Sequence, residues 1–188
     1  KARLKQRLRE IASELIKIAA LRELKEAPVL TPPEGAWDEF VARFPYEETE
    51  DQESSINAVL EDLAKGKPMD RLVCGDVGFG KTEVAMRAAF VTALSGLQVA
   101  IVVPTTLLAR QHFKNFAERF LGLPVRIAQA SRLVPAKDLI DVRQGLKSGS
   151  IDIVIGTHAL LAKQMEFARL GLVVIDEEQH FGVAHKER

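Results

Sequence analysis

The glycine-rich segment at residues 75–82 restricts the fold of this chain more than any other feature of its sequence. It reads GDVGFGKT and matches the pattern G-x-x-x-x-G-K-[ST] in full. A short apolar run at 72–74 precedes it, and a stretch of helical period follows it. Such a loop turns its backbone N–H groups around a polyphosphate, and the N-terminus of the following helix adds a positive partial charge. The flanking pattern disfavours an accidental glycine turn, so we expect a phosphate-binding loop made of Gly75, Asp76, Val77, Gly78, Phe79, Gly80, Lys81 and Thr82.

Four side chains predict the chemistry of this site. The Lys81 ammonium would reach the β- and γ-phosphates, and the Thr82 hydroxyl would coordinate Mg²⁺. Asp176 and Glu177 follow the apolar run 172–175, where a buried strand is expected to end. We expect Asp176 to hold Mg²⁺ mostly through water, and Glu177 to orient and deprotonate the attacking water. The alternative for this acidic pair is a solvated turn.

Apolar runs alternate with helical stretches from residue 69 onward. The runs lie at 72–74, 99–103, 125–128, 151–155 and 172–175, and the helical stretches at 82–95, 106–121, 135–147 and 158–166. Continuously apolar strands that alternate with helices indicate an α/β fold, with a mostly parallel sheet covered by helices on both faces. Right-handed crossovers are then expected, and ligands bind at the carboxyl ends of the strands.

The first 27 residues predict a long helix. Its apolar residues recur at alternating spacings of four and three, at Leu4, Leu8, Ile11, Leu15 and Ile18. The helix either packs on its own domain, or is a solvated linker, or couples this domain to another module. Prolines and a glycine mark a linker at 28–45, and Thr49 is a plausible N-cap for a helix over 50–64.

Composition excludes several classes of protein. The 188 residues include 26 basic and 26 acidic side chains, so the formal net charge is zero, which by itself argues against a basic nucleic-acid-binding face. The charge is unevenly distributed, however. Residues 1–26 hold eight basic and four acidic side chains, whereas residues 38–66 hold two basic and nine acidic side chains. The lone Cys74 excludes a disulfide framework and a cysteine-based zinc site, and the four histidines lack metal-binding spacing. No apolar run approaches the roughly 20 residues of a membrane-spanning helix.

The segment 176–180 reads DEEQH and resembles the D-E-x-[HQ] box of superfamily 2 helicases and translocases. No N-K-x-D motif indicates a GTPase, and nothing identifies the acceptor pocket of a small-molecule kinase. Four further stretches resemble the first motor domain of the bacterial transcription-repair coupling factor. They read FPYEETEDQ at 44–52, MDRLVCGDVGFGKTEVAMR at 69–87, VPTTLLA at 103–109 and FGVAHKER at 181–188.

This resemblance implies a RecA-like P-loop domain at 46–188, truncated at its C-terminus, after a connecting helix at 1–27 and a linker at 28–45. It also implies the ATP-binding first lobe of a double-stranded DNA translocase in the bacterial cytoplasm. Such a protein displaces stalled RNA polymerase and couples transcription to nucleotide excision repair. A second RecA-like domain would supply arginine fingers, whose loss lowers the rate about 10³–10⁵-fold, so we expect the chain alone to hydrolyse ATP poorly. Two alternatives remain: the motor lobe of a fork-reversing DNA helicase, and a non-catalytic module switched by nucleotide.

The resemblance also implies roles for residues outside the phosphate loop. Gln52 would read adenine, Phe44 and Pro45 would pack against the base, and Gln179 would sense the γ-phosphate. His180 stands where the family more often has arginine, and its role stays open. The residues that would contact the DNA backbone follow three of the expected strands and are Thr105, Thr106, Arg132, Thr157 and His158. The alternatives for them are helix caps and solvated side chains.

Overall fold

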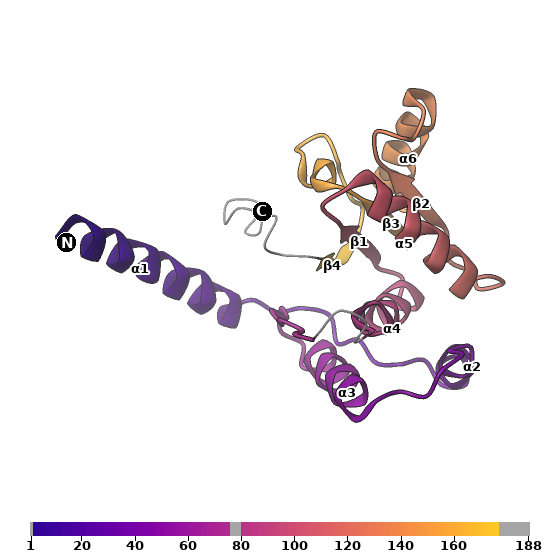
Figure 1. Ribbon diagram of the computed structural model, residues 1–188, viewed down its shortest axis with the longest axis horizontal. Helices are drawn as coiled ribbons and strands as arrows, with labels where there is room; N and C mark the ends of the chain where they lie inside the picture. The colour runs from indigo at the N-terminus through magenta and orange to yellow at the C-terminus, as the bar shows by residue number, and fades with distance from the viewer. Residues whose placement is uncertain (1, 76–79, 177–188) are drawn as a thin grey trace. The chain divides into compact units, whose positions relative to one another are not determined.

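The computed structural model describes residues 2–75 and 80–176 (Figure 1). The chain divides into two compact units. The first unit consists of Lys1–Pro32 and Glu48–Lys81, and the second of Pro33–Glu47 and Thr82–Arg188. The division into a connecting helix, a linker and a motor domain therefore stays a prediction. In the described part of the chain, no helix is both long enough and apolar enough to cross a membrane.

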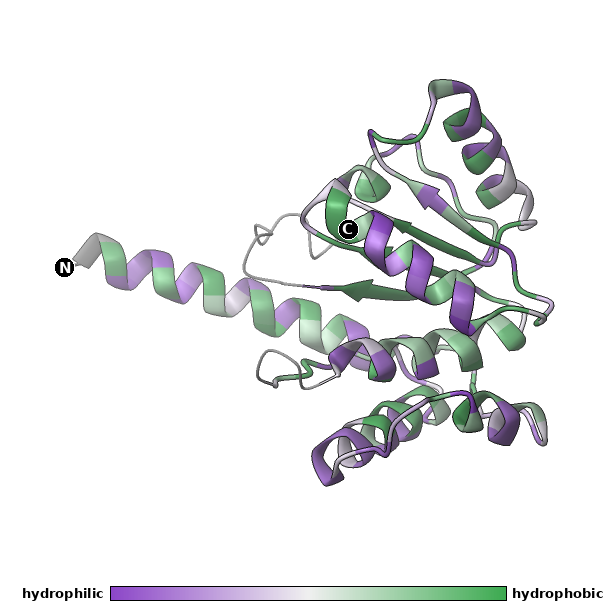
Figure 2. Ribbon diagram, turned by 45° about the vertical axis from the view of Figure 1, so that its right-hand side comes forward, coloured by the Kyte–Doolittle hydropathy of each residue, from purple (hydrophilic) through white to green (hydrophobic). Residues whose placement is uncertain are grey.

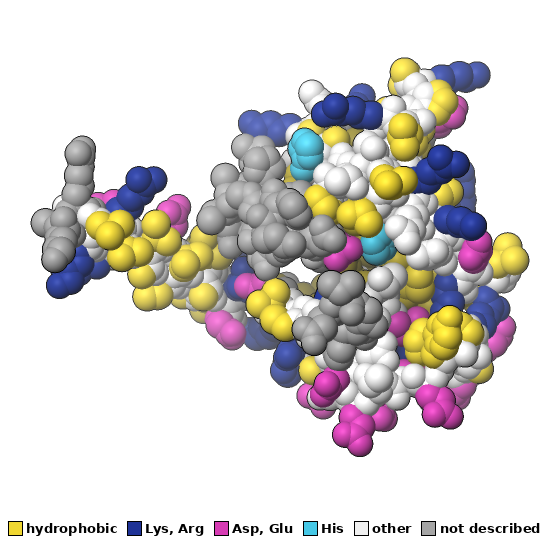
Figure 3. All heavy atoms as spheres, in the orientation of Figure 1, with side chains coloured by type: hydrophobic (Ala, Val, Ile, Leu, Met, Phe, Trp, Pro, Cys, Tyr) yellow, Lys and Arg dark blue, Asp and Glu magenta, His cyan; other side chains and the backbone are white. Residues whose placement is uncertain are grey.

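Two helices form most of the first unit: α1 spans Ala2–Leu24, and α3 spans Glu50–Ala64. The predicted apolar stripe of α1 is largely exposed, and its side chains from Leu4 to Leu15 are 45–65% accessible. Figure 3 shows hydrophobic side chains in yellow along α1, and Figure 2 shows the alternation of apolar and polar residues on this helix. The segment after α1 is anchored near the end of α3, because the backbone N–H of Leu30 donates to the carbonyl of Leu63 at 2.9 Å.

The second unit contains a four-stranded parallel sheet. Its strands are β1 (Gln98–Val102), β2 (Ile127–Ala130), β3 (Ile153–Gly156) and β4 (Leu170–Ile175), in the order β2-β3-β1-β4. β1 and β3 are fully buried, and their sequences are apolar apart from Gln98, whose side-chain amide donates to the carbonyls of Leu146 and Ile151. The registers pair Val102 with both Gly156 and Ile175, and Gly156 with Ala130. All four strands therefore end in one row.

Helices cover both faces of this sheet. The chain passes from β1 through α5 (Thr106–Arg119) to β2, and returns through α6 (Ala136–Ser148) to β3. Because these two crossovers run in opposite directions, right-handed connections place α5 and α6 on opposite faces. The face that carries Ala100 and Val154 packs with Val142 and Leu146 of α6. This arrangement confirms the predicted α/β fold, which is RecA-like.

Short aromatic contacts join the helices of the second unit. α2 (Ala36–Ala42) and α4 (Lys81–Leu94) contact each other through Phe40 and Phe90, whose rings stack with centroids 4.2 Å apart. Phe120, which follows α5, lies 5.0 Å from Phe40 between ring centroids. These rings are buried and form the apolar layer between the helices.

The structure differs from the sequence prediction at two places. The apolar run 72–74 is not a strand: Leu72 is 71% exposed, and Cys74 is also exposed, so this run gains nothing from the pleated burial that favours a strand. The stretch 158–166 contains only a 3₁₀ turn, η1, over His158–Leu161, because Ala162 has an extended backbone with ψ of 148°. That extension lets Leu161 and Met165 pack against the α6 side of the core.

Candidate functional site

The predicted Mg²⁺ ligand and several predicted DNA contacts lie at the carboxyl edge of the sheet. Because the four strands end in one row, the residue after each strand leaves from the same edge. These residues include Asp176 after β4, Thr157 after β3 and Ser131 after β2. Thr157 is buried, whereas Arg132 and His158 are exposed. The structure thus brings the predicted Mg²⁺ carboxylate and the predicted DNA contacts to one edge of one sheet.

Thr105 and Thr106 begin the helix that follows β1. The Thr105 hydroxyl accepts a hydrogen bond from the backbone N–H of Leu108 at 3.2 Å, so Thr105 is the N-cap of α5. Thr106 is the first residue of the helix. Helix capping, the alternative expected for these residues, therefore belongs to Thr105 and not to Thr106.

Of the described loop residues, Gly75, Gly80 and Lys81 belong to the first unit, and Thr82 belongs to the second. The Lys81 ammonium donates to the carbonyl oxygen of Gly75 at 2.6 Å, so this side chain folds back along the loop. Gly80 has a φ of +78°, which glycine adopts without strain. The predicted loop residues Asp76, Val77, Gly78 and Phe79 lie outside the described residues, as do Glu177, Gln179 and His180.

Gln52 lies directly against this loop. Its side chain is 6% exposed, and a Cβ built on Gly80 would collide with the Gln52 amide nitrogen, Nε2. The side-chain amide oxygen of Gln52, Oε1, accepts a hydrogen bond from the backbone N–H of Thr49 at 2.9 Å. In return, the Thr49 hydroxyl accepts one from the backbone N–H of Gln52 at 3.2 Å. This capping box begins α3. Sequence reasoning found the cap but missed the box, although T-x-x-Q at 49–52 is its signature.

Phe44, the other predicted adenine contact, lies in the second unit beside a buried ionic network. The guanidinium carbons of Arg87 and Arg119 each lie 5.9 Å from the centre of the Phe44 ring. Glu83 accepts from Arg87 at 2.8 Å and from Arg119 at 2.9 Å, and all three side chains are less than 10% exposed. Sequence reasoning did not find this network, although Glu83 and Arg87 have the i,i+4 spacing of a helical ion pair.

Asp176 also has a partner that sequence reasoning missed. Its Oδ2 lies 3.0 Å from Nε2 of His112, which belongs to α5. The two residues are 64 positions apart in the chain, so no local motif indicates this contact.

Thr82 and Asp176 fit a magnesium ion by their chemistry. A hydroxyl and a carboxylate are hard oxygen donors, and Mg²⁺ commonly binds one or two such groups together with water and phosphate oxygens. Within the part of the chain that the structure describes, no group of three or more His, Cys, Asp or Glu could hold a metal.

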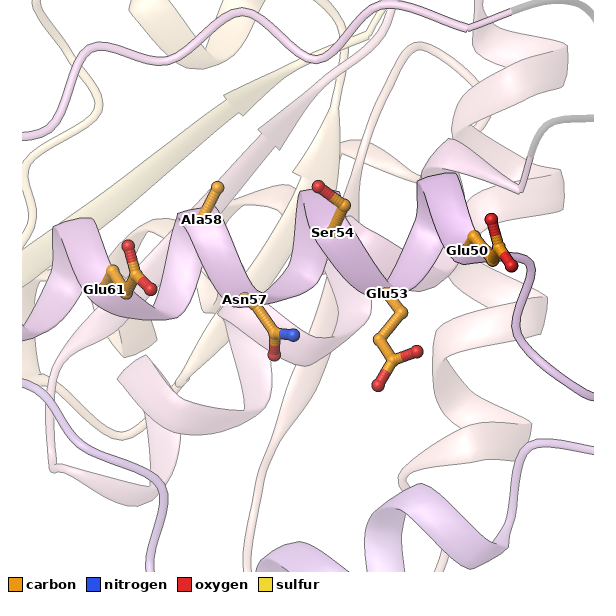
Figure 4. Close-up of a pocket in the computed structure, with 6 residues that line it drawn as sticks. All are labelled: Glu50, Glu53, Ser54, Asn57, Ala58 and Glu61. Atoms are coloured by element: carbon orange, nitrogen blue, oxygen red, sulfur yellow. The ribbon is translucent and has the colours of Figure 1, made fainter.

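A surface pocket on α3 does not suit a nucleotide. It is lined by Glu50, Glu53, Ser54, Asn57, Ala58 and Glu61 (Figure 4). Three of these six side chains are glutamates, which repel a polyphosphate. This pocket therefore lacks the chemistry of a phosphate site, and the glycine loop stays the predicted one.

Comparison with known proteins gives one family and several relatives. Residues 49–188 match the family model of the DEAD/DEAH box helicases. Over its full length, the chain is 53% identical to the transcription-repair-coupling factor of Rickettsia bellii and 48% identical to that of Bacillus subtilis. It spans only 17% and 16% of these two proteins. The resemblance found in the sequence is thereby confirmed.

Two solved structures are also similar. The structure of RecG bound to a three-way DNA junction superimposes with a TM-score of 0.79 and 36% identity, covering 88% of this chain and 23% of that one. A hypothetical ATP-dependent RNA helicase from Sulfolobus tokodaii gives a TM-score of 0.59 at 21% identity, over 78% of this chain and 42% of that one. The latter match shows the fold alone.

Proposed function

Because the chain belongs to the DEAD/DEAH box helicase family, we propose that it is the ATP-binding first motor lobe of a double-stranded DNA translocase. One observation supports this most: the register of the sheet puts Asp176 and the strand-end residues predicted to contact DNA at the same edge. A translocase must link a nucleotide to a DNA strand, and a shared edge provides the shortest connection between them. Two of its relatives are named transcription-repair-coupling factors, so we propose further that the whole protein displaces stalled RNA polymerase and couples transcription to excision repair.

The nucleotide would be bound from both ends. The phosphate loop at 75–82 would surround the phosphates, and Lys81 would exchange the Gly75 carbonyl for a phosphate oxygen. Gln52 would read adenine, because a planar amide can bond two edge atoms of the base at once. Phe44 would pack on the base. Thr82 and Asp176 would hold Mg²⁺, which neutralises the charge that develops on the phosphates.

Hydrolysis would depend on Glu177 and Gln179. Glu177 would orient the attacking water and accept its proton, and Gln179 would sense the γ-phosphate. The DNA backbone would be held without sequence preference by Thr105, Thr106, Arg132, Thr157 and His158, since contacts to phosphate carry no sequence information. We place the protein in the bacterial cytoplasm, where its proposed partners act.

The experiment that tests this function uses the full-length protein on a stalled transcription complex. The wild-type protein should release RNA polymerase in the presence of ATP. The Glu177→Gln variant should bind ATP and fail to release the polymerase, because the attacking water is no longer activated. Release of RNA polymerase by the Glu177→Gln variant at the wild-type rate would show that Glu177 is not the base that activates the water.

A fork-reversing helicase is the second candidate function. The similarity to RecG on a three-way DNA junction favours it, at 36% identity. The same preparation should therefore be offered a branched DNA without polymerase. ATP-driven reversal of that junction, together with no effect on stalled polymerase, would establish the second function in place of the first.

A further inference from the structure

His112 is a largely buried polar residue that none of the proposed ATP and DNA contacts includes. It lies on α5 between Ala109 and Phe116, which are both fully buried, three residues after the former and four before the latter. The spacing places all three on the helix face that is turned inward. The His112 side chain is only 13% exposed, and its Nε2 lies 3.0 Å from Oδ2 of Asp176. This inward helix face thus directs the His112 imidazole at the proposed Mg²⁺ carboxylate.

This contact restricts the Asp176 side chain, whose backbone is already held. The backbone N–H of Asp176 donates to the carbonyl of Val102 at 2.9 Å and continues the pairing of β1 with β4. Because a carboxylate accepts hydrogen bonds, the proton of a neutral imidazole belongs on Nε2 here. Among the described residues, the buried Nδ1 has no hydrogen-bond partner, so the contact of Nε2 with Asp176 alone indicates the tautomer. The geometry therefore assigns the Nε2–H tautomer to His112.

α5 also connects His112 to the proposed DNA contacts. The helix is capped by Thr105, and His112 lies two helical turns after that cap, about 10 Å along the axis. A hydrogen-bonded helix is stiff over two turns, so a displacement of the loop at Thr105 also displaces the imidazole. A displaced imidazole would in turn move the Asp176 carboxylate, because the two groups are in contact at 3.0 Å.

We propose that His112 is a positioning residue, which holds the Asp176 carboxylate in the orientation that binds Mg²⁺ and links it through α5 to the DNA-contacting loop. The proposal rests on the proposed function, in which Asp176 holds the ion. Partners that orient a metal-binding group in this way typically change metal affinity about 10–100-fold when they are removed.

The first test measures metal-dependent binding without turnover. A fluorescent, non-hydrolysable ATP analogue is titrated into the full-length protein at a series of Mg²⁺ concentrations. His112→Leu should raise the Mg²⁺ concentration for half-maximal binding about tenfold or more. His112→Gln can place an amide N–H near the position of Nε2 and should stay within about threefold of the wild type. Lys114→Ala is the matched control, because Lys114 is on the same helix, is 76% exposed and should change nothing.

The same titration separates positioning from a purely structural role. Binding of the analogue without Mg²⁺ should be equal in the wild type and in His112→Leu, since only the metal-dependent part is predicted to change. Equal losses with and without Mg²⁺, or equal Mg²⁺ dependence in the Leu and Gln variants, would overturn the proposal. If the Leu variant does not fold, the nitrogen chemical shifts of His112 in the wild type decide, and an Nδ1–H tautomer would be the contrary result.

A second measurement addresses the link to DNA. Duplex DNA should lower the Mg²⁺ concentration for half-maximal binding in the wild type, and this effect should shrink at least about threefold in His112→Leu, because the link through α5 is lost. An unchanged DNA effect would refute the link. Failure of the proposed function gives a different result: the wild-type protein would then bind the analogue without any dependence on Mg²⁺ or on Lys81.

Discussion

At the scale of single residues, the Gln52 side chain lies in close contact with Gly80. Gly80 has a left-handed backbone, and the Gln52 amide occupies the space that a Cβ at this position would need. A side chain at residue 80 would therefore strain the backbone and would have to displace the amide of Gln52, the residue proposed to read adenine. The sequence does not predict this contact, because the contact arises only when α3 packs against the loop.

We expect Gly80→Ala to weaken binding of the ATP analogue by about tenfold or more, since displaced Gln52 loses at least one hydrogen bond. Gly96→Ala is the control: Gly96 has a similar φ of +83°, but nothing lies within 4 Å of the position that a Cβ would take there. The control should lose about 1–2 kcal/mol of stability through backbone strain and should bind the analogue normally. Fluorescence titration and urea unfolding of both variants provide the two measurements. Equal nucleotide affinities would contradict the proposed fit.

The buried network at Glu83 gives a second prediction. Glu83→Gln removes the buried carboxylate that accepts from both Arg87 and Arg119. Breaking such a pair destabilises a protein by about 3–5 kcal/mol, and urea unfolding of the chain measures the loss. Glu39→Gln removes a 66% exposed partner of Arg43 and should lose less than about 1 kcal/mol. A similar loss in both variants would show that burial does not matter here.

At the scale of elements, an ion pair holds the end of α3 to the segment that leads into the phosphate loop. Asp62 accepts from Arg71 Nε at 2.5 Å and from Lys65 at 2.7 Å. The hydrogen bond from Arg71 is the main cause that lowers the pKa of Asp62 from 3.8 to about 2. The same contact raises the pKa of Arg71. The carboxylate thus favours the folded chain only while it is ionised.

The stability from this pair is present above the unfolded pKa of 3.8 and is lost as the pH falls through the folded pKa of about 2. Arg71 is 36% exposed, so solvent screening reduces the contribution to about 1 kcal/mol. Between about pH 6 and about pH 2, the wild-type chain should therefore lose about 1 kcal/mol more than Asp62→Asn. Urea unfolding at both pH values measures this difference, and parallel losses in the two proteins would contradict it.

The sequence predicted elements well where local signals determine them. The Thr49 cap and the glycine after the helix predicted 50–64, which matches α3. The prediction of a strand at 72–74 was wrong, because three apolar residues do not reveal whether a neighbouring strand is available to pair with them. The contact between His112 and Asp176 could not be predicted either, since it depends on how α5 packs beside β4.

At the scale of the whole molecule, the fold was predictable because alternating strands and helices have few solutions. Continuously apolar strands require cover on both faces, and right-handed crossovers then fix which helix lies on which face. Net zero charge did not exclude a DNA-binding role, because the proposed contacts are a few hydroxyls and one guanidinium at a sheet edge. The chain spans about a sixth of the length of its curated relatives, so movement along DNA is a property to measure in the full-length protein.

The central claim is that the loop at 75–82 binds the ATP that drives movement along duplex DNA. The most direct test is the rate at which the full-length protein displaces a third strand from a DNA triplex in the presence of ATP. We predict displacement by the wild-type protein and none by a folded Lys81→Ala variant, which cannot bind the β- and γ-phosphates. Displacement by Lys81→Ala at the wild-type rate would contradict the claim.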